Sequence, residues 1–121
     1  MYCDILEHVL TFVQNLSQQE GLWREHLVLL ENIYEVVHLF YLPQIHTELV
    51  PTLMEFVLDG NTEVRKQSAK CLAKVLARQH HVPAKEELID FIITRLFQSQ
   101  NFGHRRTFIQ FCCFVVDLIP F

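Results

Sequence analysis

The residue types most able to do covalent chemistry are the adjacent thiols Cys112 and Cys113, with His104 before them. A catalytic thiol needs a base within hydrogen-bonding reach. His104 lies eight residues before Cys112, about 12 Å along a helix, which is too far for that role. Motifs of serine hydrolases, phosphate-binding glycine loops and zinc proteases are also absent from the sequence. We therefore expect no enzymatic activity.

The histidines give no pattern typical of a metal site. Zinc requires three or four converging ligands, and the adjacent pair His80-His81 offers no third or fourth. The other histidines before that pair show no H-x-x-x-H spacing; they are His8, His26, His38 and His46. We expect His80-His81 to lie on a surface linker, and we expect no metal and no cofactor.

Charge and hydropathy exclude two classes of partner. The formal net charge is −4, which opposes binding to a phosphate backbone. Gln110 and Asp117 interrupt the longest apolar run, so we expect no membrane span, and Met1–Asp4 does not begin a secretory signal. The four cysteines lack C-x-x-C spacing, and we expect them to be reduced and mostly buried. These features favour the cytoplasm, with the nucleus as an alternative.

The spacing of apolar residues predicts an all-α protein of about six antiparallel helices. Glycine is scarce, and no segment alternates cleanly between apolar and polar residues, so strands have little support. A capping box at 17–20 and Pro43 bound the second helix, and Pro51 is expected to bend the third. The expected helices are about 5–16, 20–42, 45–58, 62–78, 83–97 and 104–118.

Specific side chains are expected to be buried, to cap or to turn. Asn61 or Thr62 should cap the fourth helix, and Gly60 or Asn61 should adopt a left-handed backbone. Arg65 and Lys66 should lie outside the apolar face of that helix. The expected apolar face of the fourth helix is Val64, Ser68, Cys71, Leu72, Val75 and Leu76. In the fifth helix the expected buried residues are Leu88, Ile89, Ile92, Ile93, Leu96 and Phe97.

The helices recur with a period of 40 residues. Arg65 aligns with Arg105, and Lys66 aligns with Arg106. A two-helix unit of this length, repeated three times, is typical of a helical solenoid. The predicted repeats are about 2–40, 43–80 and 83–119.

The middle repeat resembles the HEAT family. Pro51, then Asp59, then Val64-Arg65 follow the spacing of the HEAT motif, whereas Ser17 and Ser99 stand where the flanking repeats would have aspartate. The resemblance implies an α-α superhelix, with residues 1–121 forming one HEAT-repeat domain. It also implies that the chain is part of a longer solenoid, that it is monomeric, and that apolar surface is exposed at its C-terminal end.

Two HEAT subfamilies imply different partners. The run from His104 to Cys112 is similar to scaffold and regulatory subunits of the protein phosphatase 2A and 4 group, which implies binding to a phosphatase catalytic subunit. The alternative is a tubulin-binding TOG domain, which Gly21-Leu22-Trp23-Arg24 resembles. Trp23 would be a contact residue or a cap on the core, and each arginine a contact residue, an internal partner or a solvated charge. The candidate protein-binding residues are Trp23, Arg24, Asn61, Thr62, Arg65, Lys66, His104, Arg105 and Arg106.

Overall fold

The computed structural model describes residues 22–37 and 49–118, together with His8, Thr11 and Asn15. This part of the chain is all-α and contains no strand, as the sequence predicts. His8, Thr11 and Asn15 are helical and exposed, at the spacing of one helix face. Most of the expected helix 5–16, the capping box 17–20 and the start of the expected helix 45–58 lie outside the described residues. The five described helices are α2 (Trp23–Val36), α4 (Val50–Phe56), α5 (Thr62–Arg78), α6 (Val82–Ile92) and α7 (Phe102–Leu118).

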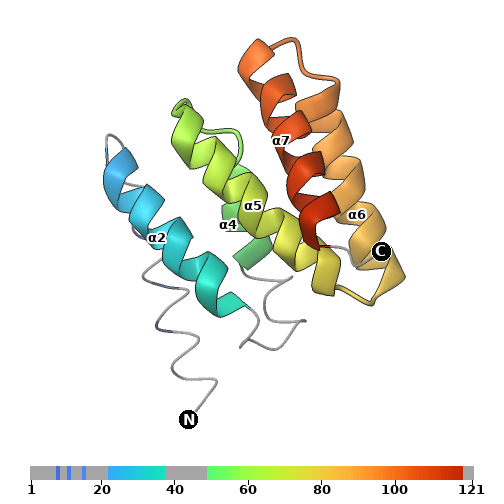
Figure 1. Cartoon of the computed structure of the whole chain (residues 1–121), viewed down its shortest axis with the longest axis horizontal. Coiled ribbons are helices and arrows are strands. Elements are labelled where there is room, and N and C mark those ends of the chain that lie inside the picture. Colours follow the sequence, from blue (N-terminus) through green and yellow to red (C-terminus); the bar gives the residue numbers. More distant parts are fainter. Residues whose placement is uncertain (1–7, 9–10, 12–14, 16–21, 38–48, 119–121) are drawn as a thin grey trace.

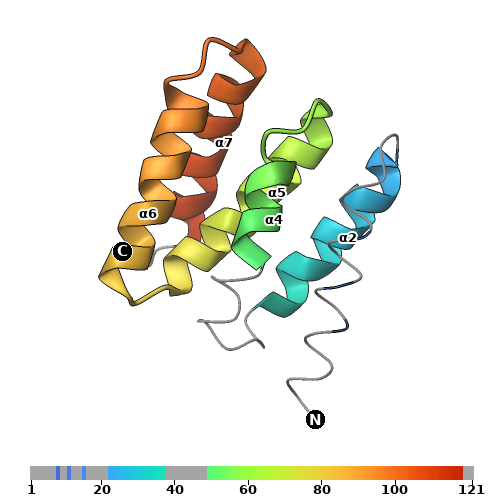
Figure 2. The ribbon, with the colours of Figure 1, turned by 180° about the vertical axis from the view of Figure 1, so that it is seen from behind.

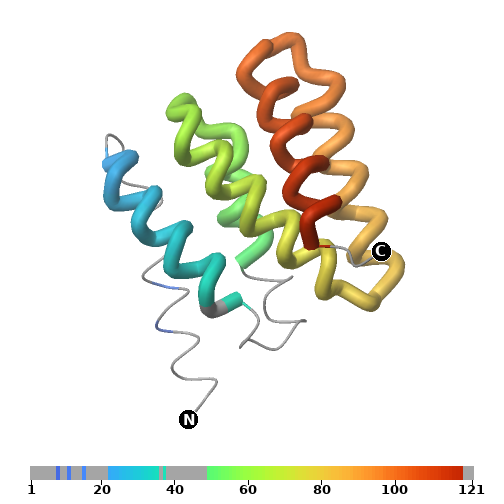
Figure 3. Tube along the Cα trace, in the orientation of Figure 1, coloured from blue at the N-terminus to red at the C-terminus, as the bar shows by residue number. Residues whose placement is uncertain are grey.

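The helices form two layers. In Figure 1, α2, α5 and α7 run side by side in the same direction, and α4 and α6 lie behind them. Figure 2, from behind, shows α4 and α6 in front, each antiparallel to the helix that follows it. The trace in Figure 3 shows that the α4–α5 and α6–α7 turns lie at the same end of the molecule, where α2 also begins. Two helical hairpins therefore stand next to one another in the same orientation.

Helix α5 is the centre of the described core and packs against α2, α4 and α7. Most of its expected apolar face is buried, and Leu76 is half-buried. The Cys71 thiol donates to the Leu30 carbonyl oxygen of α2 at 3.3 Å. The Lys74 ammonium donates to the Tyr34 carbonyl oxygen at 2.6 Å and lies 4.2 Å from the centre of the Tyr34 ring. These contacts join α5 to α2.

A second face of α5 is also buried, which the sequence analysis did not predict. Arg65, Ala69 and Ala73 recur every four residues, and all three are buried. Gly103 at the start of α7 lies against the Arg65 guanidinium, so this face is directed toward α7. The alanines leave room for two helices to approach closely. The expectation that Arg65 lies outside the buried part of α5 is therefore wrong.

Half of the burial expected for the fifth helix is wrong. Leu88, Ile92 and Leu96 are buried, whereas the other three predicted residues are exposed. Ile93–Phe97 continues α6 as a π-helix, and Gln98 donates its backbone N–H to the carbonyl oxygen of Ile93, five residues earlier. No described element covers the outer side of the α6–α7 hairpin. The exposed residues are Ile89, Ile93 and Phe97, at 40%, 37% and 56%.

The turn before α5 confirms one expectation and corrects another. Asn61 is the N-cap and Thr62 is the first helical residue. Neither Gly60 nor Asn61 has a left-handed backbone, since Asn61 has φ −87° and Gly60 has no positive φ. Pro51 lies in the first turn of α4, where its missing N–H would have no helical partner. None of the described helices is long and apolar enough to cross a membrane.

Candidate functional site

The turns that join α4 to α5 and α6 to α7 are built from the same hydrogen bonds. The Asn61 side chain accepts from the backbone N–H groups two and three residues later, at 2.9 and 3.1 Å. The Asn101 side chain does the same at 2.8 and 3.4 Å. Each asparagine donates its own N–H to a side-chain oxygen two residues earlier, on Asp59 at 2.8 Å and on Ser99 at 3.0 Å. Both helix starts are thereby capped, and α7 begins at Phe102, two residues before its predicted start.

An arginine completes each turn. Arg65 Nη1 donates to the Asp59 carbonyl oxygen at 2.8 Å, and Arg105 Nη1 donates to the Ser99 carbonyl oxygen at 3.0 Å. In both turns the acceptor lies six residues before the arginine. A positive charge is unfavourable near a helix N-terminus, and this hydrogen bond offsets that cost. The 40-residue period of the sequence is therefore present in the structure as a repeated hydrogen-bond pattern.

The repeated pattern explains why serine can replace aspartate. The arginine binds a backbone carbonyl, so it does not need a carboxylate at the position of Asp59 or Ser99. The side chain there has only to accept a hydrogen bond from the asparagine N–H, which a carboxylate and a hydroxyl both do. The departure at Ser99 from the HEAT motif therefore leaves the turn intact.

The two arginines differ in exposure. Arg65 is 8% exposed, its Nη2 donates to Thr62 Oγ1 at 3.1 Å, and its Nε has no hydrogen-bond partner among the described residues. Arg105 is exposed, and its guanidinium lies 6.0 Å from the ring centre of Phe102, which occupies the position of Thr62 in the next turn. Arg65 is therefore an internal partner of the neighbouring turn, whereas Arg105 is available to a ligand.

The structure brings the predicted site residues to one end of the molecule, because α2, α5 and α7 begin there (Figure 1). Trp23 is 38% exposed, with the Arg24 guanidinium 5.0 Å from its ring centre. Thr62, Lys66 and Arg106 are exposed, and Asn61 and His104 are half-buried. His104 Nδ1 lies 3.2 Å from Ser99 Oγ.

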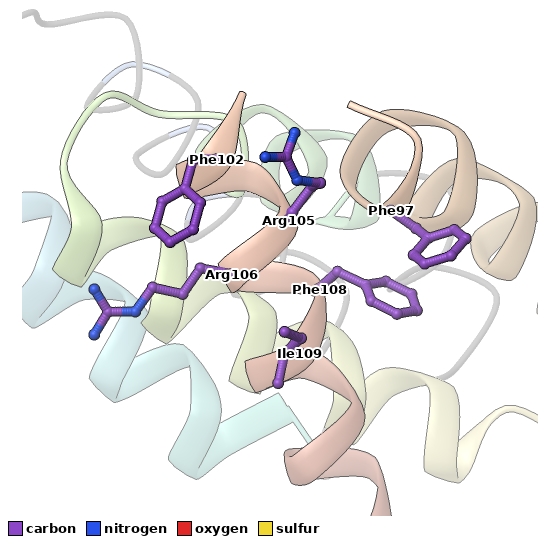
Figure 4. A pocket seen from close by; sticks show the side chains of 6 residues that line it. All are labelled: Phe97, Phe102, Arg105, Arg106, Phe108 and Ile109. Carbon is purple, nitrogen blue, oxygen red and sulfur yellow. The ribbon is translucent and has the colours of Figure 1, made fainter. Parts of the chain in front are cut away.

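A pocket of about 370 Å³ lies on the α6–α7 hairpin, next to this end. Figure 4 shows the Phe97 and Phe108 side chains next to each other, one from the π-helix and one from α7. Their ring centres are 4.9 Å apart. The Arg105 and Arg106 guanidinium groups point apart (Figure 4). Its lining residues are Phe97, Phe102, Arg105, Arg106, Phe108 and Ile109.

The sequence analysis found the two arginines of this pocket and missed its apolar residues. Phe97 was expected in the core, whereas Phe102, Phe108 and Ile109 were not considered as contact residues. Phe102 and Ile109 are 72% and 63% exposed. Their seven-residue separation places them on one side of α7, a signal that becomes readable once that side is known to be uncovered.

The charge around the pocket has one sign. From Phe91 to Val116 the chain has no aspartate or glutamate, and it has Arg95, Arg105 and Arg106. The formal net charge of the whole chain is −4. The pocket is therefore a locally positive region of an acidic chain.

The described residues offer little for covalent or metal chemistry. Cys71, Cys112 and Cys113 are free thiols, and Cys113 is exposed, contrary to the expectation of burial. Burial raises the pKa of the Cys71 thiol to about 12, so it stays protonated at neutral pH. No group of three metal-ligating side chains occurs in the described ranges.

Fold and site together define an all-α protein in which two hairpins share one turn architecture and an apolar, arginine-bearing surface. The sequence matches no known family model, and neither curated proteins nor solved structures give a match.

Proposed function

We propose that this chain is a protein-binding scaffold of the HEAT type, in which stacked helical hairpins form an α-α superhelix. The observation that carries the proposal is the shared hydrogen-bond pattern of the turns at Asn61 and Asn101, 40 residues apart. The parallel orientation of the two hairpins in Figure 1 supports it. Repeated hairpins of this kind bury their faces against neighbours and present extended binding surfaces.

The proposed contact surface consists of the N-terminal ends of α2, α5 and α7 and the pocket on the α6–α7 hairpin. Aromatic residues and arginine are enriched among residues that dominate binding energy at protein interfaces. Phe97, Phe102 and Ile109 are exposed next to Arg105 and Arg106. Since most surface residues on monomeric proteins are polar, a continuous apolar group of this kind is typical of an interaction site.

The proposed partner is the catalytic subunit of a serine/threonine protein phosphatase, as the sequence resemblance implies. The proposed role is contact without turnover, in the cytoplasm or the nucleus. The test is affinity purification from cell lysate with the full chain as bait, followed by mass spectrometry. We expect a phosphatase catalytic subunit to be retained.

The controls use exposed apolar positions on two helices. Ile109→Asp places a charge in the pocket and should abolish capture. Val28→Asp makes the same change on α2, where Val28 is 56% exposed, and should preserve capture. Equal capture by both variants, or no specifically retained protein, would contradict the proposed surface.

Tubulin is the second candidate partner, and the exposed Trp23 with Arg24 against its ring favours it. Co-elution of the chain with tubulin in gel filtration, lost on Trp23→Ala and kept on Ile109→Asp, would support tubulin over the phosphatase. Separate elution would exclude it.

A further inference from the structure

The inference concerns the ligand of the α6–α7 pocket and rests on the proposed role as a protein-binding scaffold. We propose that this pocket binds an extended peptide segment of the partner in which an apolar side chain lies close to aspartate or glutamate. Three observations carry the proposal: the size of the pocket, its lining and its charge.

The size of the pocket fits a few side chains. A volume of about 370 Å³ is near the lower end of the range of roughly 300–1,000 Å³ typical of ligand pockets. Four of the six lining residues are apolar, and Phe97 and Phe108 present adjacent rings. A leucine or phenylalanine side chain of a peptide would bury apolar surface here.

The charge of the pocket requires an acidic ligand. Arg106 is exposed and has no hydrogen bond or ion pair within the described residues, and Arg105 uses Nη1 for the Ser99 carbonyl oxygen. No carboxylate lines the pocket. Because guanidinium groups bind carboxylates with charge-assisted hydrogen bonds, the pocket complements aspartate or glutamate next to the apolar anchor.

Two other anionic ligands fit less well. Nucleic acid and anionic membranes carry dense negative charge, and the formal net charge of −4 repels both. The hollow between the Phe97 and Phe108 side of the hairpin and the rest of α7 accepts a discrete side chain, whereas a membrane surface needs a broad insertion face. A short acidic peptide avoids most of the long-range repulsion.

The experiment is selection of random nine-residue peptides displayed on phage, with the full chain as bait. We expect enriched peptides to combine an apolar residue with aspartate or glutamate. Synthetic copies of the enriched peptides are then titrated against the full chain by fluorescence anisotropy. Arg106→Glu should weaken binding about tenfold or more, because an attractive contact becomes repulsive. Replacing the peptide's acidic residues by their amides should weaken binding in the same direction, and added salt should do likewise.

Matched variants separate local from general effects. Ile109→Asp should also abolish peptide binding, whereas Arg78→Glu, an equal charge reversal at the exposed end of α5, should change the dissociation constant less than about twofold. Circular dichroism checks that each variant is folded. Arg106 and Ile109 are both exposed, so neither change disturbs the core.

Several outcomes would overturn the inference. They are the absence of enriched peptides, enrichment of basic or uncharged sequences, binding unaffected by Arg106→Glu, and sedimentation with phosphatidylserine vesicles that Ile109→Asp abolishes. Failure here is distinguishable from failure of the proposed function: a partner captured by the chain and lost with Ile109→Asp, but insensitive to Arg106→Glu, would preserve the scaffold and exclude the acidic peptide.

Discussion

The Arg65 guanidinium of the first hairpin turn lies directly against Gly103 of the second. A Cβ atom added to Gly103 would lie 2.8 Å from Arg65 Nη2 and 3.2 Å from Arg65 Cζ. The arginine cannot swing away easily, because it is buried and its Nη1 binds the Asp59 carbonyl oxygen. The two hairpins are therefore in contact through one arginine and the absence of one side chain.

The first prediction is that Gly103→Ala lowers the free energy of unfolding by about 1–3 kcal/mol, as overpacking does in a filled site. Alanine would otherwise favour the helix by roughly 0.8–1 kcal/mol, so a net loss reports the clash with Arg65. The control is Gly60→Ala, since nothing lies within 4 Å of its added Cβ. That control should be neutral or stabilising by about 0.4–1 kcal/mol in urea denaturation. Equal effects at the two glycines would contradict the close contact.

The second prediction compares the two repeat-related arginines. Arg65→Ala should destabilise by about 1.5–3 kcal/mol, because it removes hydrogen bonds from a charged, buried donor. Arg105→Ala should cost less, about 0.5–1.5 kcal/mol, because water can replace its exposed contact with the Ser99 carbonyl oxygen. Thermal unfolding of both variants checks the order. A larger loss at Arg105 would show that burial does not distinguish the turns.

The third prediction concerns the caps. Asn61→Ala and Asn101→Ala should each lower stability by about 0.5–2 kcal/mol, because each leaves two helix N–H groups without their acceptor. Asn32→Ala is the matched control, since Asn32 is exposed within α2 and donates only to the Val28 carbonyl oxygen. The control should be neutral or slightly stabilising. Chemical denaturation of all three variants measures the difference, and a similar loss in all three would argue against capping.

The fourth prediction concerns Cys71. Its folded-state pKa is about 12 against an ordinary value of 9.0, so the folded protein holds the proton more tightly than the unfolded chain. Stability from this group is intact below about pH 9 and falls as pH rises toward 12, because only the unfolded chain releases the proton in that window. Cys71→Ala should flatten this part of the stability profile. Iodoacetamide at pH 8 should label the exposed Cys113 faster than Cys71, as peptide mapping would show. Faster labelling of Cys71 would contradict its burial.

The fifth prediction uses two serines. Ser68 Oγ is buried and has no hydrogen-bond partner among the described residues, so Ser68→Ala should be neutral or stabilising by up to about 1 kcal/mol. Ser99 Oγ accepts from the Asn101 N–H, and Ser99→Ala should be destabilising. Thermal melts of the two variants should shift in opposite directions. A marked loss with Ser68→Ala would mean that its hydroxyl is satisfied.

Sequence periodicity predicted the helices well where one side of each helix meets a neighbour. The apolar positions of α5 and the buried residues Leu88, Ile92 and Leu96 illustrate this success. Periodicity failed at Arg65, because a charged side chain reads as exposed unless its internal acceptor, here the Asp59 carbonyl oxygen, is known. It failed at Phe97 for the opposite reason, because apolar character predicts burial whether or not another element covers the residue.

The candidate site was predictable only in its polar part. Aligning the chain with itself at a 40-residue offset identified Arg105 and Arg106. The same offset aligns Asn61 with Asn101, a pairing that would have predicted the second cap. The apolar lining depends on which face of α7 lacks a neighbour, and that is a property of packing, which no local pattern records.

The π-helical segment Ile93–Phe97 holds one wall of the pocket with one more residue in its turn than an α-helix requires. Deleting the exposed Thr94 would bring the buried Ile92 and Leu96 from four positions apart to three, and both spacings keep two residues on one side of an α-helix. The core could thus tolerate the loss of a codon that reshapes the pocket. Length variation at this point is a route by which ligand preference could evolve without any change to the buried residues.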